Sequence, residues 1–121
     1  MADFARSLPI LASLNLAETA QFYTTILKFE VVGLYDDYLI VRRDEIEIHY
    51  TLCDDPNLPL MTACYIRGGQ VSALFDEFNQ VTFTSGKISD FSIRPWNMKE
   101  FYVHDPHGNL LKFGCDPEEC K

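Results

Sequence analysis

The sequence lacks any apolar run approaching the roughly 20 residues that a membrane span needs, and its N-terminus lacks a signal-peptide pattern. Basic residues are also scarce: 10 Lys and Arg stand against 18 Asp and Glu, for a formal net charge of −8. Because phosphate backbones are bound by Lys and Arg, this balance disfavours a nucleic-acid partner. We therefore expect a cytoplasmic protein that binds neither nucleic acid nor a membrane.

Sequence signatures of common chemistry are missing as well. The four cysteines, Cys53, Cys64, Cys115 and Cys120, show no C-x-x-C spacing, and reduced thiols are the simplest expectation, although Cys115 and Cys120 could pair artificially under oxidation. There is no phosphate loop, dinucleotide fingerprint or nucleophile elbow. The segment Arg67-Gly68-Gly69-Gln70 could hold an anion at a helix start, but a flexible strand-to-helix corner is the favoured explanation, because two glycines alone are weak evidence.

Aromatic residues, by contrast, are frequent in this chain of 121 residues, with nine Phe, six Tyr and one Trp. Hydrophobic residues make up 47%, which is enough for the packed core of one domain. A core accounts for most of the rings, and a ring-lined crevice would account for the surplus of Tyr. The acidic balance would draw cations toward such a crevice, although it also serves solubility.

Hydrophobic spacing predicts the same order of elements twice. A strand, a helix and three strands fill about residues 7–53, a linker occupies 54–60, and the order begins again over 61–115. Asn15, with Glu18 three residues later, predicts the start of the first helix. One unit would expose a whole sheet face, so the pair predicts a single α+β domain with two βαβββ repeats and a concave half-barrel sheet. The expected strands are 8–14, 30–35, 38–42, 45–52, 61–66, 81–83, 100–104 and 110–114, and the expected helices are 16–27 and 70–79.

The most informative segment is 95–113, PWNMKEFYVHDPHGNLLKF. Its centre, Asp105-Pro106-His107-Gly108-Asn109, is a hairpin turn, since Pro supplies a fixed φ and Gly a positive one. With its flanks, the segment resembles the last hairpin of the glyoxalase, bleomycin-resistance and extradiol-dioxygenase (vicinal oxygen chelate) superfamily. The motifs AQFY at 20–23 with LKF at 27–29, VRRD at 41–44 and YIRG at 65–68 are similar too. The resemblance covers about residues 7–115, and Pro95-Trp96 before the final hairpin makes bleomycin-resistance proteins the most similar members.

This resemblance implies a domain-swapped homodimer in which both subunits build each crevice. It further implies that the chain sequesters a bleomycin-family antibiotic, metal-free or copper-loaded, without modifying it and without a cofactor. Two alternatives stay open. One is a metal-dependent lyase, isomerase or thiol transferase of the same fold, and the other is a fold relative that binds a different metabolite or has a regulatory role.

The metal ligands that the resemblance implies for the enzymes are not found at the matching positions. Residues 8–14 contain no His, and Lys112 stands near the place of a last-strand Glu. Lys is cationic and has no acceptor, so it repels a metal ion. Glu47 and His49 remain as a pair, whereas a catalytic site usually takes three protein ligands. His104 and His107 flank the turn and are expected at the surface, so we predict no metal site and a binding protein rather than an enzyme.

The single tryptophan is the strongest candidate for a ligand contact. Bleomycin-type drugs carry a planar bithiazole, a cationic tail and a metal-chelating head, so they require ring faces and a few carboxylates. Trp96 follows Pro95 in an irregular segment, and Trp is a common anchor where binding energy concentrates. The sequence therefore predicts an acidic, ring-lined crevice with Trp96 at its centre.

Seven further residues complete the predicted ligand site. By resemblance, Tyr38 takes the place of a stacking Phe and Tyr65 that of a crevice-facing aromatic residue. Val32 and Gly33 stand where the relatives have an Asp and a Phe, and Tyr35 is a candidate substitute. The other four are Asp36 and Asp37, which match acidic positions of the relatives, and Glu47 and His49, which share a strand face by alternation.

Overall fold

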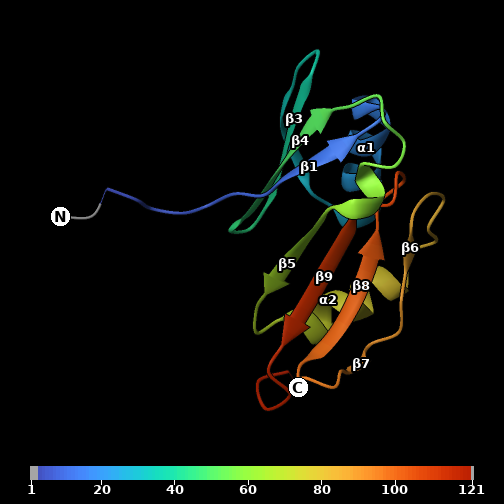
Figure 1. The fold of residues 1–121 in the computed structure, drawn as a ribbon. Coiled ribbons are helices and arrows are strands. Elements are labelled where there is room, and N and C mark those ends of the chain that lie inside the picture. The colour runs from blue at the N-terminus through green and yellow to red at the C-terminus, as the bar shows by residue number, and fades with distance from the viewer. Residues whose placement is uncertain (1–2, 121) are drawn as a thin grey trace.

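The computed structural model describes residues 3–120, and Figure 1 shows a chain that completes one half before it enters the other. Each half has a sheet with a helix on one of its faces. The first half consists of β1 (Ile10–Ser13), α1 (Leu16–Phe22), η1 (Tyr23–Leu27), β2 (Glu30–Leu34), β3 (Tyr38–Arg43) and β4 (Ile46–Leu52). After η2 (Pro59–Met61), the second half consists of β5 (Ala63–Arg67), α2 (Val71–Asn79), β6 (Lys87–Ile88), β7 (Ser92–Ile93), β8 (Lys99–His104) and β9 (Leu110–Cys115).

The first half follows the predicted order closely. Its sheet has the order β1-β4-β3-β2, with β1 parallel to β4. Asn15 caps α1 as expected, because its side chain accepts the Glu18 backbone N–H at 3.0 Å. The predicted helix 16–27 is continuous, but its last five residues form a π-helix that ends at Lys28, which has a left-handed φ of 60°.

The second half corrects one predicted strand. Its sheet has the order β5-β9-β8-β6, with β7 also paired to β8. Residues 81–83, expected as a strand, form a bend and coil, and β6 and β7 pair with β8 instead. The apolar alternation there has another cause: Val81 and Phe83 pack against the core, and the Phe83 ring lies 6.2 Å from that of Phe22 in the first half.

The core lies between each helix and its sheet. In the second half, Phe101 and Phe113 stack with ring centroids 4.8 Å apart, and Phe78 of α2 contacts both. In the first half, the Tyr23 and Tyr50 rings lie 5.6 Å apart. The sequence predicted one half-barrel sheet, whereas the chain forms two separate, unclosed sheets (Figure 1).

The predicted turn at 105–109 joins the halves. Asp105 and Asn109 are buried, and the Asn109 Nδ2 donates to the carbonyl of Ala12 in β1 at 2.6 Å. The His107 side chain is only 9% exposed, and its Nδ1 accepts the Leu14 N–H of the first half at 3.3 Å. The expectation of a surface position for His107 was therefore wrong: this turn is covered by the first half.

The C-terminal segment differs from the expectation of reduced thiols. Cys115 ends β9, and a turn whose backbone bonds return to the Asp116 carbonyl brings Cys120 back to form a disulfide with it. Cys53 and Cys64 are free. None of the helices within residues 3–120 has the length and apolar character that crossing a membrane requires.

Candidate functional site

Each sheet has an open face opposite its helix, and most of the predicted site residues lie on these two faces. Directly opposed residues on neighbouring strands share a face. Register therefore places His49 with Ile10 and Ile40 on the open face of the first half. Lys112 is opposed to Tyr65 and Tyr102, which places all three on the open face of the second half.

The first of two clusters joins Tyr38, His49 and Glu47. The Tyr38 hydroxyl lies 2.7 Å from His49 Nδ1, and His49 Nε2 lies 2.7 Å from a Glu47 carboxylate oxygen. Arg6 and Arg42 approach the same carboxylate at 3.7 and 3.9 Å. The hydrogen bond to His49 and the nearby guanidinium groups hold the pKa of Glu47 below its usual value, against the opposing effect of burial. We call these three residues the Tyr38 cluster.

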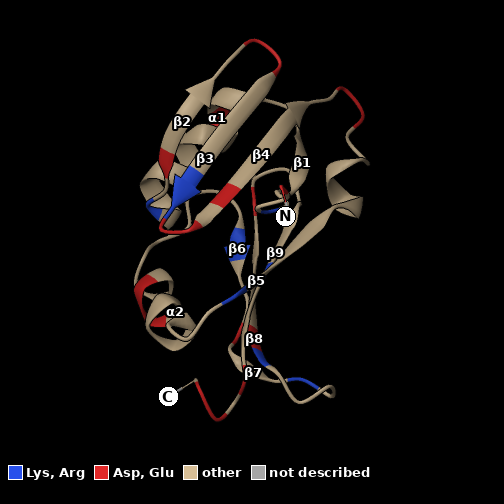
Figure 2. Cartoon of the chain, turned by 90° about the vertical axis from the view of Figure 1, so that its left-hand side faces the viewer, with Lys and Arg blue, Asp and Glu red and all other residues tan. Residues whose placement is uncertain are grey.

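Tyr35 also contributes a ring to this open face. Gly33 is opposed to Ile40, so it lies on the open face, and a Cβ there would come within 2.7 Å of the Tyr35 ring. The ring therefore covers Gly33, in the place where a side chain at position 33 would stand. Whether Tyr35 substitutes there as a ligand contact stays a prediction. Asp36 and Asp37 are exposed at the adjacent turn between β2 and β3, where Figure 2 shows acidic residues at the tip.

The second cluster is centred on Glu100 of β8. Its carboxylate accepts the Trp96 indole N–H at 2.9 Å, the Tyr65 hydroxyl at 2.6 Å and the Tyr102 hydroxyl at 2.8 Å. Glu100 is only 1% exposed, yet the rings of Trp96 and Tyr65 are 58% and 44% exposed. We call these four residues the Glu100 cluster, and it offers ring faces that a buried carboxylate holds in place.

The pKa values of this cluster reflect the same contacts. Burial alone would raise the pKa of Glu100, but its three donors and the Lys112 charge outweigh burial and lower it. Burial and the hydrogen bond to Glu100 raise the pKa of Tyr65 to about 12, and they raise that of Tyr102 as well. Sequence reasoning missed Glu100, although alternation along β8 would have placed it on the face of Tyr102.

A hollow of about 320 Å³ adjoins the Glu100 cluster, and its lining residues are Tyr65, Arg67, Trp96, Met98, Glu100 and Lys112. Two cations therefore face it against one carboxylate. The expectation of an acidic crevice does not hold at this end of the chain. Acidic residues gather at the β2–β3 turn, in the loop after β4 and in the C-terminal segment that follows β9 (Figure 2).

The two clusters lie in different halves of the same chain. Trp96 belongs to the β7–β8 connection at one end of the molecule, whereas Asp36, Asp37 and Tyr38 lie at the other end (Figures 1 and 2). Glu47 and Tyr65 approach more closely, because both line a hollow of about 380 Å³ between β4 and β5. The structure thus groups the predicted residues into two sets and does not bring Trp96 to Tyr38 within one chain.

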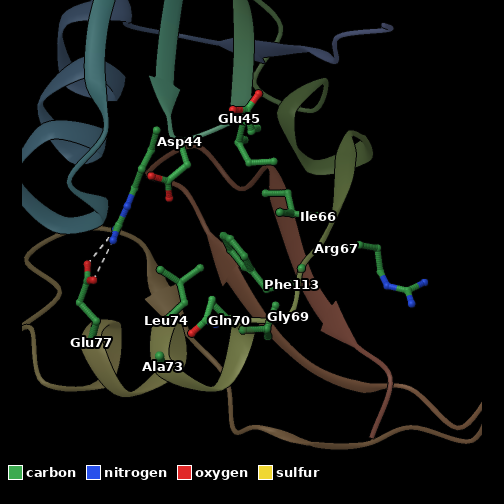
Figure 3. A pocket seen from close by; sticks show the side chains of 14 residues that line it. Asp44, Glu45, Ile66, Arg67, Gly69, Gln70, Ala73, Leu74, Glu77 and Phe113 are labelled. Atoms are coloured by element: carbon green, nitrogen blue, oxygen red, sulfur yellow. Dashed lines mark hydrogen bonds and ion pairs between the residues drawn. The ribbon is translucent and has the colours of Figure 1, made fainter. Parts of the chain in front are cut away.

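A further hollow, of about 340 Å³, lies between the β3–β4 turn and the start of α2 (Figure 3). It is mainly apolar, with Phe113, Ile66 and Leu74 on its walls, and the ion pair between Arg43 and Glu77 closes one side. The predicted site residues, all within 3–120, are not among its lining residues. It is therefore separate from both clusters.

Lys112 occupies the open face where a metal ligand was considered. Its Nζ lies 5.6 Å from the centre of the Tyr102 ring, and its charge acts on Glu100. A second cation at this point would be repelled. Within residues 3–120, no three His, Cys, Asp or Glu side chains gather closely enough to hold a metal ion.

Solved structures that share this arrangement include bleomycin-binding proteins and a putative glyoxalase family protein. A bleomycin-binding protein from Streptomyces verticillus, solved with copper(II)-bleomycin, has a TM-score of 0.83 at 23% identity, covering 95% of this chain and 98% of that one. The bleomycin resistance determinant encoded on transposon Tn5 has a TM-score of 0.80 at 21% identity, covering 94% of this chain and 99% of that one. A Bacillus anthracis protein assigned to the glyoxalase family has a TM-score of 0.70 at 18% identity, covering 96% and 99%.

No family model and no curated protein sequence matches this chain. The structural similarity nevertheless shows that the chain has the α+β fold of the bleomycin-binding proteins. The resemblance first noted at residues 95–113 is thereby confirmed at the level of the fold.

Proposed function

We propose that this chain binds a bleomycin-type antibiotic and sequesters it without chemical change. The observation that carries the proposal is the Glu100 cluster, in which a buried carboxylate fixes exposed Trp and Tyr rings on an open sheet face. A planar bithiazole stacks on such rings, and each ring pair contributes about 0.5–1.5 kcal/mol beyond the burial of area. The fold supports the same function, because similar structures have been solved with bleomycin and with copper(II)-bleomycin.

In this proposal, the cationic tail of the drug lies toward the first half. Asp36 and Asp37 supply carboxylates there, and the rings of Tyr35 and Tyr38 supply faces that attract cations. The drug undergoes no reaction, since the open face of the second half presents Lys112 where a divalent ion would have to bind. Titration with the metal-free and with the copper-loaded drug decides which form the protein binds.

We further propose that a second copy of the chain completes each crevice, as in a domain-swapped homodimer. The separation of the two clusters supports this, because one drug molecule could then contact the Tyr38 cluster of one copy and the Glu100 cluster of the other. The N-terminal segment extends beyond β1, past the point where Arg6 approaches Glu47 (Figure 1). Its Phe4 is 99% exposed, so a partner would remove apolar surface from water.

The decisive experiment is calorimetric titration of the protein with metal-free and copper-loaded bleomycin. We expect one drug per chain, and we expect Trp96→Ala to weaken binding at least tenfold, a loss of about 1.4 kcal/mol. Trp96→Phe keeps a ring but loses the donor to Glu100, so it should weaken binding less. Ile93→Ala is the matched control, because Ile93 is 60% exposed in the neighbouring strand β7 and is opposed to Lys99, on the other face.

Three outcomes would contradict the proposal. Absence of heat with both forms of the drug would exclude bleomycin, and equal binding by the Trp96→Ala and native proteins would exclude the Glu100 cluster. Turnover of a thiol or carbonyl substrate that depends on added Ni, Mn, Zn or Fe would favour the enzyme of the same fold. A monomer at micromolar concentration, measured by sedimentation with and without drug, would contradict the shared crevice.

A further inference from the structure

The hollow of about 340 Å³ between the β3–β4 turn and the start of α2 has a floor that belongs to the core (Figure 3). Ile66 of β5 and Phe113 of β9 are buried, and Leu74 of α2 adds an apolar wall. Phe113 is held in place, since its ring stacks on that of Phe101 with centroids 4.8 Å apart. A molecule in this hollow would therefore contact an apolar surface that is already formed.

The rest of the hollow offers open space and one neutralised pair of charges. An added Cβ at Gly68 or at Gly69, in the corner between β5 and α2, would meet nothing within 4 Å. Two guanidinium nitrogens of Arg43 each meet a carboxylate oxygen of Glu77 at 2.8 Å, so these two charges cancel. Small-molecule sites have volumes of about 300–1,000 Å³, have mainly apolar walls with a few polar groups, and often lie between two structural units. This hollow, between the two halves of the chain, meets all three conditions.

The charges that remain around the hollow favour a cation. Asp44 and Glu45 line it from the β3–β4 turn, and among residues 3–120 neither is in an ion pair. Arg67 also lines it, but the Arg67 side chain points away from the apolar walls (Figure 3). An ammonium group near the turn is therefore attracted, and a carboxylate there is repelled.

We propose that this hollow binds a compact aromatic amine, with its ring against Ile66, Leu74 and Phe113 and its ammonium group toward Asp44. The volume is near the lower end of the range for small-molecule sites, which suits one fused ring system better than a segment of chain. This ligand is additional to the proposed antibiotic, because the hollow shares no residue with the Tyr38 cluster or the Glu100 cluster.

Three naphthalenes of nearly equal size test this ligand class: 2-naphthylmethylamine, 2-naphthylmethanol and 2-naphthoate. Calorimetric titration of the full chain ranks them. We expect the amine to bind about threefold to tenfold more tightly than the carboxylate, with the alcohol between them. Intermolecular NOEs from the naphthalene protons to the methyl groups of Ile66 and Leu74 should place the ring in the hollow.

Two variants separate the contribution of the ring from that of the charge. Ala73 lines the hollow from the exposed surface of α2, so Ala73→Leu should fill the space and weaken the amine by about tenfold or more. Asn79→Leu is the matched control, because Asn79 is exposed on the same helix and does not line the hollow. Asp44→Asn keeps the turn, since Asn tolerates the φ of 54° found there, and it should weaken the amine by about threefold while leaving the alcohol unchanged. Asp54→Asn, at an exposed position of the loop after β4, controls for the lost charge.

Absence of heat with every probe, or tighter binding of 2-naphthoate than of the amine, would overturn the inference. Equal binding of the amine by the Ala73→Leu and native proteins would do so too, and so would displacement of the amine by bleomycin, because the hollow would then not be a separate site. NOEs between two copies of the chain at the Ile66 and Leu74 methyl groups, without any probe, would mean that a second copy fills the hollow and would also overturn it. Failure of bleomycin to bind would contradict the proposed function alone.

Discussion

The hydroxyl of Tyr50 in β4 donates a hydrogen bond of 2.7 Å to the carboxylate of Asp105, which lies in the turn between β8 and β9. Tyr50 also shares a hydrogen bond of 2.7 Å with Tyr23, so a chain of buried polar groups runs from the first helix to the second half. Tyr23 and Tyr50 are fully buried and Asp105 is 2% exposed. Burial raises the pKa of Asp105, against the opposing effect of the hydrogen bonds that it accepts. The carboxylate that joins the halves is therefore stabilised in its charged form by its hydrogen-bond donors.

Removing this hydroxyl should therefore destabilise the whole chain. Tyr50→Phe removes one donor to the buried Asp105 carboxylate, which keeps its bonds from Asn109 and His107, and it removes the hydrogen-bond partner of the Tyr23 hydroxyl, so it should cost about 1–3 kcal/mol of unfolding free energy. Denaturant unfolding at pH 7 measures the loss. Tyr35→Phe is the control, since Tyr35 is 61% exposed and its loss of a hydroxyl should change stability by less than about 0.5 kcal/mol. Equal stability of the two variants would mean that the bond does not hold the halves together.

Local signals predicted most of the fold. Asn15 and Glu18 placed the start of α1 because a cap is a contact between near neighbours in sequence. The strand expected at 81–83 failed because apolar alternation reports burial and not hydrogen bonding. Phe83 is partly buried against the core and contacts Phe22, a residue 61 positions earlier, rather than a neighbouring strand.

The candidate site was less predictable for the same reason. Glu100 is the residue on which Trp96, Tyr65 and Tyr102 converge, and Tyr65 lies 35 positions away in sequence. In the sequence, Glu100 is an ordinary charged residue of a predicted strand. Only the register of the folded sheet shows which aromatic rings contact it. His107 was expected in water for a similar reason: a turn motif specifies backbone geometry and does not specify what covers it.

The ion pair between Arg43 of β3 and Glu77 of α2 should give a pH-dependent contribution to stability. Both guanidinium nitrogens meet the carboxylate at 2.8 Å, and this contact holds the pKa of Glu77 below its usual value. A lowered pKa means that the stabilisation is present above about pH 4.3 and is lost as the pH falls through the folded-state pKa. Because Glu77 is 39% exposed, Glu77→Gln should cost no more than about 1 kcal/mol at pH 7.

Denaturant unfolding at pH 7 and pH 3 tests this contribution. The difference between the native protein and the Glu77→Gln variant should be smaller at the lower pH, because protonation of Glu77 removes the charge that pairs with Arg43. Glu119→Gln serves as the control, because Glu119 is exposed and, among residues 3–120, in no ion pair. A difference that is the same at both pH values would show that the effect of Glu77→Gln does not come from charge.

Gly114 controls the position of Tyr65. A Cβ at residue 114 would overlap the Tyr65 hydroxyl and come within 2.8 Å of the ring carbon that bears it. Gly114→Ala should therefore move this hydroxyl away from Glu100, and the pKa of Tyr65 should fall from about 12 toward the ordinary value of about 10. A pH titration of ¹³C-labelled tyrosine by NMR measures it. Gly68→Ala is the control because nothing lies within 4 Å of its added Cβ, and a Tyr65 pKa that stays near 12 in Gly114→Ala would contradict this account.

The Tyr38 cluster should hold the neutral His49 ring in one tautomer. Glu47, when ionised, can only accept, so the hydrogen must reside on Nε2, and Nδ1 then accepts the Tyr38 hydroxyl hydrogen. In this state the Tyr38 oxygen can offer a ligand only lone pairs, which suits an N–H donor of the ligand.

The ¹⁵N shifts of the His49 ring identify the protonated nitrogen, and we expect Nε2–H in the native protein. Glu47→Gln should release this preference and populate both tautomers, while Glu30→Gln, at an exposed position of β2, should leave it unchanged. An Nδ1–H tautomer in the native protein would mean that Tyr38 keeps its hydrogen for the ligand, and that the first half does not select for a donor.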